Sequence, residues 1–283
     1  MPPRTAPTAR QQRLGSELRK LRERAGMTAS EAGALLGADQ ARISNIESGR
    51  AGVSAQRLRA LAQTYDCADR QLIDALTTLT GSRTRHWWEE YRGTLPPGLL
   101  DLAEIEHHAV ALRTAQTSIL PGLLQTSDHA RVIFDQGVPP LPPDEVEHRV
   151  AHRLRRQGVL CRDTPMPYTA VIHEAALRMR FGGRDVTRAQ LDHLVAMSER
   201  ENVRVLAIPF ERGEFPGAGQ TILYASGPVA QLDTVQLDQS HGPALLDAAD
   251  QLARYRALLD RMEELALDRA RSRDFIRAIA RAV

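Results

Sequence analysis

Residues 27–50 read MTASEAGALLGADQARISNIESGR, a pattern that predicts two short helices joined by a tight turn. Thr28 and Glu31 form a capping box, in which each side chain accepts a hydrogen bond from the other's backbone N–H, so a helix should begin at Thr28. Gly37 can adopt the positive φ that ends a helix at low cost. Asp39 is then a suitable N-cap for the helix that follows.

The two faces of this following helix differ in chemistry. Ile43 and Ile46 lie on one side, where we expect them to be buried, and Ala32, Leu35 and Leu36 form the expected buried stripe of the helix before. The opposite side carries small or short polar side chains of the kind that can meet base edges in a DNA major groove. These outward residues are Gln40, Ala41, Ser44 and Asn45.

Over about residues 10–75 the chain resembles the Cro/lambda-repressor-type helix-turn-helix family, also called the XRE family. The motifs that carry this resemblance are Leu18-Arg19-x-Leu21-Arg22, Thr28, Leu36-Gly37 and Ile43-Ser44-x-Ile46-Glu47-x-Gly49-Arg50. The resemblance implies a domain that binds double-stranded DNA. Family members usually carry Gln at the position of Ala29, so this chain lacks that contact. The expected DNA-binding residues are Thr28, Gln40, Ala41, Arg42, Ser44, Asn45 and Arg50.

The positive charge is concentrated at the N-terminal end. Residues 1–75 hold twelve Arg or Lys against eight Asp or Glu, an excess of four, whereas the net charge of the whole chain is only +2. A modestly basic domain suits contact with phosphates. The candidates for that contact are Arg10, Arg13, Arg42 and Arg50.

At 283 residues the chain is long enough for two domains. Ser54 opens a fourth predicted helix, and residues 69–79 form a fifth, so a five-helix bundle should occupy residues 10–80 after a disordered stretch at 1–9. Residues 81–98 are predicted to be a linker or hinge. Residues 99–283 then form a second domain.

This second domain mixes helix and strand patterns. Long helices are expected at 99–116, from Asp144 to about 157, at 187–200 and at 244–270. The third of these should begin with a capping box, Thr187-x-x-Gln190. Strands are expected at 168–172, 203–208, 221–225 and 229–237. The predicted fold class is therefore mostly α with a smaller α+β part: an N-terminal helix-turn-helix bundle and a C-terminal α+β domain with a small sheet and long helices.

The second domain is similar to the uncharacterised domain DUF5753 from about Trp87 onward. The motifs concerned are Pro121-Gly122-Leu123-Leu124-Gln125-Thr126, Arg153-x-x-Arg156-Gln157, His173-Glu174-Ala175-Ala176-Leu177-Arg178 and Gln190-Leu191-x-x-Leu194. The resemblance implies a transcriptional regulator of the Scr1 type, toxin–antitoxin-like and typical of actinobacteria. Such a regulator pairs with a small neighbouring protein of the DUF397 type.

The sequence predicts no catalytic set, metal site or cofactor, so we do not expect an enzyme. His148 and His152 have the spacing of metal ligands on a helix, but arginines crowd them and they are expected to be surface residues. No apolar run is long enough to span a membrane, and the N-terminus lacks an apolar signal core. With only Cys67 and Cys161 and no paired spacing, the cysteines fit a reducing cytoplasm.

Two roles for the second domain remain open from the sequence. In the first, it forms a homodimer through the helices at 99–116 and 244–270 and docks a small acidic protein. Arg149, Arg153 and Arg156 would supply the basic docking surface. In the alternative, a pocket near residues 211–219 binds a small metabolite, and the chain is a ligand-sensing regulator.

Overall fold

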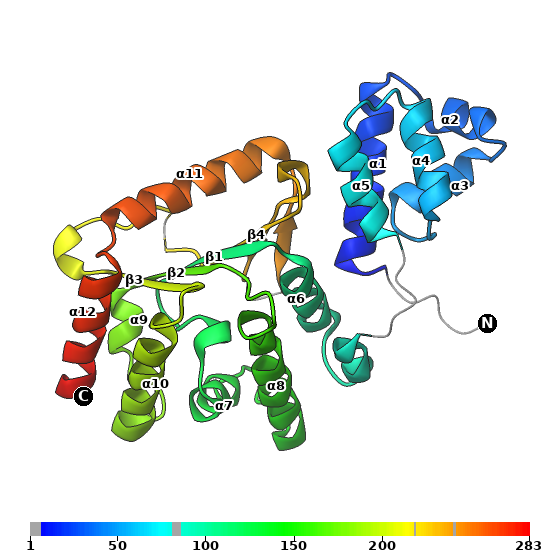
Figure 1. Cartoon of the computed structure of the whole chain (residues 1–283). Helices are drawn as coiled ribbons and strands as arrows, with labels where there is room; N and C mark the ends of the chain where they lie inside the picture. Colours follow the sequence, from blue (N-terminus) through cyan, green and yellow to red (C-terminus); the bar gives the residue numbers. More distant parts are fainter. Residues whose placement is uncertain (1–6, 81–85, 218, 240–241) are drawn as a thin grey trace. The chain divides into compact units, whose positions relative to one another are not determined.

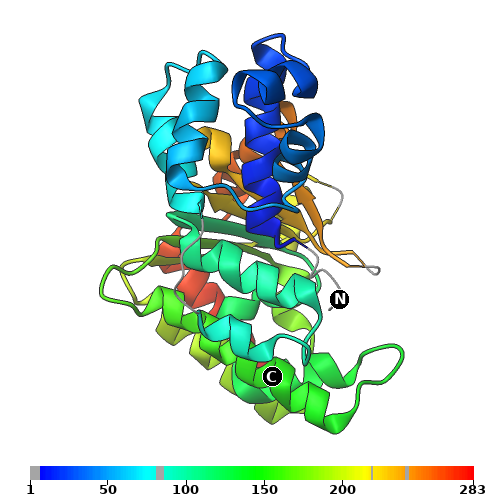
Figure 2. The same cartoon turned by 90° about the vertical axis from the view of Figure 1, so that its right-hand side faces the viewer.

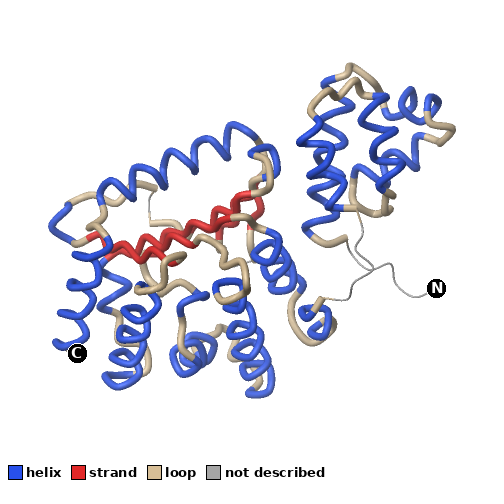
Figure 3. The backbone as a smooth tube through the Cα atoms, viewed as in Figure 1, coloured by secondary structure: helices blue, strands red, loops and turns tan. Residues whose placement is uncertain are grey.

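The chain forms two compact units, which the computed structural model describes over residues 7–80, 86–217, 219–239 and 242–283. The first unit is Met1–Glu90 with the short segment Pro228–Leu232, and the second is Tyr91–Gly227 with Asp233–Val283 (Figure 1). Helices dominate, and a six-stranded sheet lies in the second unit (Figure 3). The predicted fold class is confirmed. In the described part of the chain, no helix combines the length and apolar character needed to cross a membrane.

The first unit is a helical bundle, seen from two sides in Figures 1 and 2. Its helices begin where a short polar side chain accepts a hydrogen bond from an otherwise unpaired backbone N–H, as Thr28, Asp39 and Ser54 do. The five predicted helices are present. They are α1 (Ala9–Arg24), α2 (Ala29–Leu35), α3 (Gln40–Glu47), α4 (Ala55–Thr64) and α5 (Arg70–Leu79).

Two expectations for this unit are corrected. Ala9 already belongs to α1, whose N-cap is Thr8, so the expected disorder does not extend to these residues; positions 1–6 lie outside the described residues. Leu35 is 66% exposed, so it is not part of the buried stripe of α2. Helix α2 is only seven residues long, and its buried residues are Ala32 and Gly33.

The sheet of the second unit combines parallel and antiparallel pairs in the order β3-β2-β1-β4-β5-β6. The first three strands run parallel, and the remaining pairs are antiparallel. The strands are β1 (Ala111–Gln116), β2 (Tyr168–His173), β3 (Val203–Ile208), β4 (Ile222–Ser226), β5 (Thr234–Leu237) and β6 (Ala244–Leu246). The predicted strands at 168–172, 203–208 and 221–225 are confirmed within a residue at either end. Only the last part of the one predicted at 229–237 is extended.

Helices cover the two faces of the sheet unequally. In Figures 1 and 3, α11 lies alone on one face of the sheet, and the other helices of the second unit lie on the opposite face. Successive residues of β2 alternate accordingly, because Ala170 and Ile172 face the larger helical layer while Val171 faces α11. The helices are α6 (Pro97–His108), α7 (Ser127–Asp135), α8 (Pro143–Arg156), α9 (Glu174–Arg178), α10 (Gly183–Ser198), α11 (Ala249–Leu265) and α12 (Arg269–Ala282).

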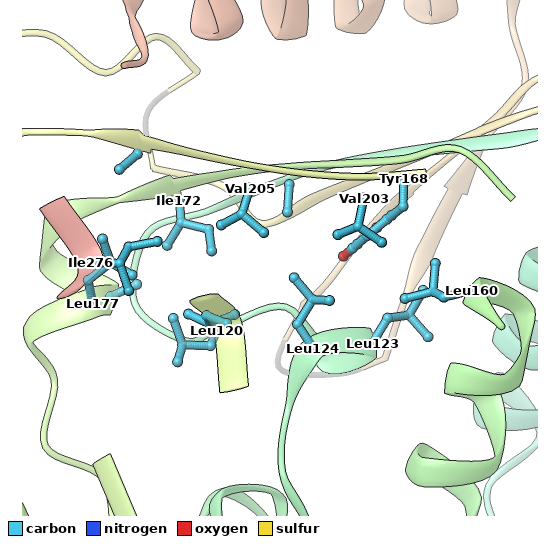
Figure 4. Close-up of a cluster of buried hydrophobic side chains, with 14 of the residues drawn as sticks. Leu120, Leu123, Leu124, Leu160, Tyr168, Ile172, Leu177, Val203, Val205 and Ile276 are labelled. Carbon is cyan, nitrogen blue, oxygen red and sulfur yellow. The ribbon is translucent and has the colours of Figure 1, made fainter. Parts of the chain in front are cut away.

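The main core of this unit lies between the sheet and the larger helical layer. Figure 4 shows Leu120 and Leu124 from the segment after β1 pointing toward Ile172 and Val203 of the sheet. Ile276 of α12 reaches the same core. These residues are fully buried or nearly so. Since Leu191 of α10 belongs to the same cluster as Ile276, the core ties both α10 and α12 to the sheet near β3.

The helix predicted at 99–116 is wrong in its second half. Helix α6 ends at His108, and the following residues form β1, a central strand hydrogen-bonded to β2 and β4. The prediction at 244–270 is wrong in the same way. Its start is the edge strand β6, and the rest is divided between α11 and α12. At β1 pairing with strands far along the chain decides the conformation of an ambiguous apolar pattern, and at β6 pairing with the preceding strand β5 does so.

The capping box predicted at Thr187 does not form, since both Thr187 and Gln190 lie inside α10. Gln190 instead fixes the segment before α7. Its Oε1 accepts a hydrogen bond from the backbone N–H of Thr126 at 2.7 Å, and its Nε2 donates to the carbonyl of Leu124 at 2.7 Å. Asp144, expected as the N-cap of α8, lies instead in its first turn, because the N-cap is Pro142 and Pro143 is the first residue of the helix.

Candidate nucleic-acid interface

Helices α2 and α3 form the helix-turn-helix that the sequence predicts. The Thr28–Glu31 capping box is complete, with both reciprocal hydrogen bonds present. Gly37 has a φ of +61°, and the Asp39 carboxylate accepts a hydrogen bond from the Arg42 backbone N–H at 2.7 Å. These three local devices stop one helix and start the next within a few residues.

The outer face of α3 carries the residues expected there. Ile43 and Ile46 are buried in the core of the first unit. On the other side, Gln40, Ala41, Arg42 and Ser44 are exposed and Asn45 is half-buried. The side chains at these exposed positions are short, apart from those of Gln40 and Arg42. This face of α3 therefore offers hydrogen-bonding groups close to the helix backbone.

Helix α3 is held against α1 by contact between backbones. A Cβ added at Gly15 of α1 would lie 2.4 Å from the carbonyl oxygen of Glu47 and 2.6 Å from that of Ile46. Gly49, with a φ of +71°, makes a similar approach to the carbonyl carbon of Gln11, where a Cβ would lie at 2.9 Å. Only glycine permits these crossings. The position of α3 is thus fixed by main-chain contact at its C-terminal end.

A buried ion pair that the sequence reading missed reinforces this junction. The Nε and Nη2 atoms of Arg22 donate to the two carboxylate oxygens of Glu47 at 2.6 and 2.9 Å, and Nη1 donates to the Met27 carbonyl at 2.6 Å. Burial, and secondarily the Glu47 carboxylate, raises the pKa of the nearby Tyr65 hydroxyl to about 12. Arg22 and Glu47 both lie in the motifs quoted above, but the two residues are 25 positions apart, and no local pattern in the sequence indicates that they pair.

The four candidate phosphate contacts divide into two groups. Arg10 donates to the Thr78 carbonyl, and the Arg13 side chain is only 10% exposed and lies 3.4 Å from the Glu17 carboxylate. Both are therefore engaged within the bundle. Arg42 and Arg50 are exposed, and neither makes an ion pair with any described residue. Those two guanidinium groups are the ones available to an anion.

The basic docking surface predicted on α8 does not exist as proposed. Arg156 is 6% exposed and its guanidinium donates to both oxygens of the buried Glu106 carboxylate at 2.7 and 2.6 Å. Arg153 stacks 4.1 Å from the centre of the Phe134 ring and donates to the Gln125 side chain. Because arginine has a long apolar stem and many donors, it suits such internal bridging.

The remaining surface predictions on α8 are only partly correct. Arg149 is half-buried and pairs with Glu145 one turn away at 2.6 Å. His148 is exposed as expected, but His152 is buried, which corrects the prediction for that residue. Burial, with the neighbouring arginines, lowers the pKa of His152 to about 3, so its ring is neutral.

Comparison with known families supports both halves of this description. Residues 99–278 match the domain of unknown function DUF5753, and residues 13–76 match a helix-turn-helix domain. No curated protein and no solved structure matches the chain. The helix-turn-helix match covers α2, α3 and their exposed face, and it supports a role in binding DNA.

Proposed function

Because the chain belongs to the DUF5753 family and also carries a helix-turn-helix domain, we propose that it is a sequence-specific DNA-binding transcriptional regulator. The observation that carries this proposal is the outer face of α3, with Gln40, Ser44 and the half-buried Asn45 beside Arg42 and Arg50, neither of which pairs with a described carboxylate. Polar side chains on one helix face read bases, while adjacent guanidinium groups hold phosphates. We assign it to the Cro/lambda-repressor (XRE) and Scr1 types on the motifs quoted above.

In this proposal α3 enters the major groove and α2 lies across the backbone, where Thr28 and the start of α2 face a phosphate. Ala41 leaves room for close approach to the bases. The chain acts in the cytoplasm, where DNA is present and thiols stay reduced. Cys67 and Cys161 fit this setting, since both are free thiols in the structure.

We propose that Gln40 contributes directly to sequence preference, since its amide can pair with the edge of adenine. Gln40→Ala should weaken binding to the operator by about 1–3 kcal/mol and weaken binding to scrambled DNA much less. Fluorescence anisotropy on both duplexes measures the difference, after the operator has been selected from genomic DNA fragments. Equal losses on the two duplexes would show that Gln40 does not read bases, and the outward face of α3 would lose its assigned role.

We assign Arg50 to phosphate contact, because it follows the Gly49 turn and lies outside the recognition face of α3. Arg50→Ala should weaken binding to every duplex alike and reduce the slope of log affinity against log salt by about one unit. Titrations at several salt concentrations test this. A changed sequence preference with an unchanged slope would contradict the assignment to phosphate.

We further propose that the second unit makes the protein a homodimer. One helix-turn-helix contacts few bases, and regulators of this type gain affinity by placing two copies on half-sites about 34 Å apart. Light scattering on the full chain should therefore give twice the 31.3 kDa mass of one chain. A monomer that nevertheless protects a two-fold symmetric operator would contradict a preformed dimer.

The second unit is also proposed to dock a small acidic protein of the DUF397 type, in an antitoxin-like pairing. The support is the DUF5753 membership and the motifs quoted above. Docking would alter DNA affinity by changing the free energy of the DNA-bound dimer. Adding the acidic protein encoded next to the gene should then change operator affinity of the full chain.

The alternative, a metabolite-sensing regulator, is favoured by one cluster in the second unit. The His173 ring at the end of β2 lies against the rings of Phe210 and Phe215, with centroids 5.3 and 5.1 Å away. Phe210 is exposed, although it follows the carboxyl end of β3. Ligands often bind beyond the carboxyl ends of parallel strands. A thermal-shift screen of metabolite extracts, repeated on Phe210→Ala, discriminates this role.

A further inference from the structure

A basic hollow lies between α10 and α12 in the second unit. It is lined by Arg188 and Asp192 of α10 and by Arg277, Ala280 and Arg281 of α12, and its volume is about 390 Å³. Ala280 is buried and its small side chain leaves the space that the arginines surround. The two helices share the core that also contains Ile276 and Leu191, so the walls of this α10–α12 hollow are fixed.

Most other arginines of these helices have structural roles. Arg269 donates to three backbone carbonyls, those of Ser198, Arg200 and Val203. Arg273 donates to the hydroxyl and the carbonyl of Ser198. Arg184 donates to the carbonyl of Val283. These bonds tie α12 to α10 and to the start of β3.

Arg188 and Arg281 differ from this pattern. Both are exposed, and across residues 7–80, 86–217, 219–239 and 242–283 neither side chain has a hydrogen bond or an ion pair. Arg277 pairs with Glu199 at 3.3 Å and with Asp274 at 3.4 Å. The positive excess of the hollow therefore comes from Arg188 and Arg281, against the carboxylate of Asp192, since Arg277 is balanced by its own two carboxylate partners.

We propose that the α10–α12 hollow docks an acidic segment of a partner protein, whose carboxylates pair with Arg188 and Arg281. This inference rests on the partner-docking part of the proposed function and moves the docking surface from α8 to α10 and α12. Guanidinium groups bind carboxylates through paired hydrogen bonds, which gives both charge and geometric complementarity. The proposed occupant is a peptide and not DNA, because the helix-turn-helix match at residues 13–76 already assigns DNA binding to the first unit.

The test uses the full-length protein and a fluorescein-labelled oligoglutamate peptide, with oligoglutamine as the uncharged probe. The double variant R188E/R281E should bind oligoglutamate roughly tenfold more weakly, since two attractive charge pairs at the surface become repulsive. The matched control R212E/R254E makes the same change in net charge at exposed arginines elsewhere in the second unit. Its affinity should stay within about twofold of the wild type.

A third variant changes affinity in the opposite direction, so that misfolding cannot imitate it. Asp192→Asn removes the one carboxylate of the hollow and should tighten oligoglutamate binding by about twofold to threefold. If R188E/R281E and the control lose affinity equally, or if Asp192→Asn has no effect, the hollow is not the docking site. If R188E/R281E loses DNA affinity and keeps peptide affinity, the hollow contacts DNA and the proposal is wrong.

The outcome also separates this inference from the proposed function. R42A/R50A should lose DNA affinity and keep oligoglutamate affinity, because those arginines lie in the first unit. A wild-type protein that binds no DNA but shows the expected peptide results would overturn the regulator role alone. A protein that binds its operator with all hollow variants behaving alike would overturn the docking surface alone.

Discussion

Arg156→Met is expected to destabilise the second unit by about 3–5 kcal/mol, since it leaves the Glu106 carboxylate buried without its partner. The pair is almost inaccessible, with Glu106 only 1% exposed, and both oxygens of the carboxylate are held by one guanidinium. Urea titration followed by circular dichroism measures the loss. Hydrogen exchange in α6 and α8 localises it, which matters because a chain of two units need not unfold in one step.

A matched control and a double variant make this prediction specific. Arg254→Met changes an exposed arginine of α11 and should cost no more than about 0.5 kcal/mol. Combining Arg156→Met with Glu106→Leu should recover much of the lost stability, because neither the buried positive charge nor the buried negative charge then remains. If Arg156→Met costs no more than the control, the ion pair does not stabilise the fold.

Glu47→Ala should abolish operator binding and destabilise the first unit by about 3–5 kcal/mol. The change leaves the Arg22 guanidinium hydrogen-bonded only to the Met27 carbonyl, with the Glu23 carboxylate 3.8 Å away, and it removes the side-chain tie between the C-terminal end of α3 and α1. DNA affinity and hydrogen exchange in α1 and α3 report the two effects together. This unit is small, so a loss of that size is a large part of its stability.

The control for this prediction is another glutamate of the same unit. Glu23 is half exposed, pairs with Arg19 at 2.7 Å and lies farther from Arg22, at 3.8 Å, so Glu23→Ala should cost no more than about 1 kcal/mol and leave DNA affinity unchanged. The pair variant R22M/E47L should refold the unit, and its DNA affinity then shows whether the charge itself is needed. Operator binding that survives Glu47→Ala would contradict the role given to the ion pair.

The parts of the fold that the sequence predicted correctly depend on near neighbours. Thr28, Asp39 and Ser54 cap helices through residues three positions away, and a pattern that short is readable in the sequence. The Thr187-x-x-Gln190 motif has the same form, but Gln190 binds backbone groups more than sixty residues away. Identical local patterns therefore have different structural roles, and the sequence alone does not say which one applies.

The same distinction explains the outcome for the candidate sites. The outward face of α3 follows from helical spacing around Ile43 and Ile46, so its exposed residues could be predicted. Arg153 and Arg156 were expected on the surface because long charged side chains usually are, and nothing nearby in sequence reveals the buried Glu106 fifty residues earlier. The α10–α12 hollow was missed for a related reason, since its two walls come from segments about ninety residues apart.

The contact between Gly15 and the end of α3 has a consequence for how this protein could acquire new DNA targets. The helix is positioned by main-chain atoms and by the Arg22–Glu47 pair, none of which belongs to the outward face. Substitutions at Gln40, Ala41 and Ser44 therefore leave the scaffold unchanged, and target preference can evolve separately from folding. A library varied at these positions alone should yield folded proteins throughout. In a separate library varied at position 15, selection for folding should recover glycine, although glycine is unfavourable inside a helix.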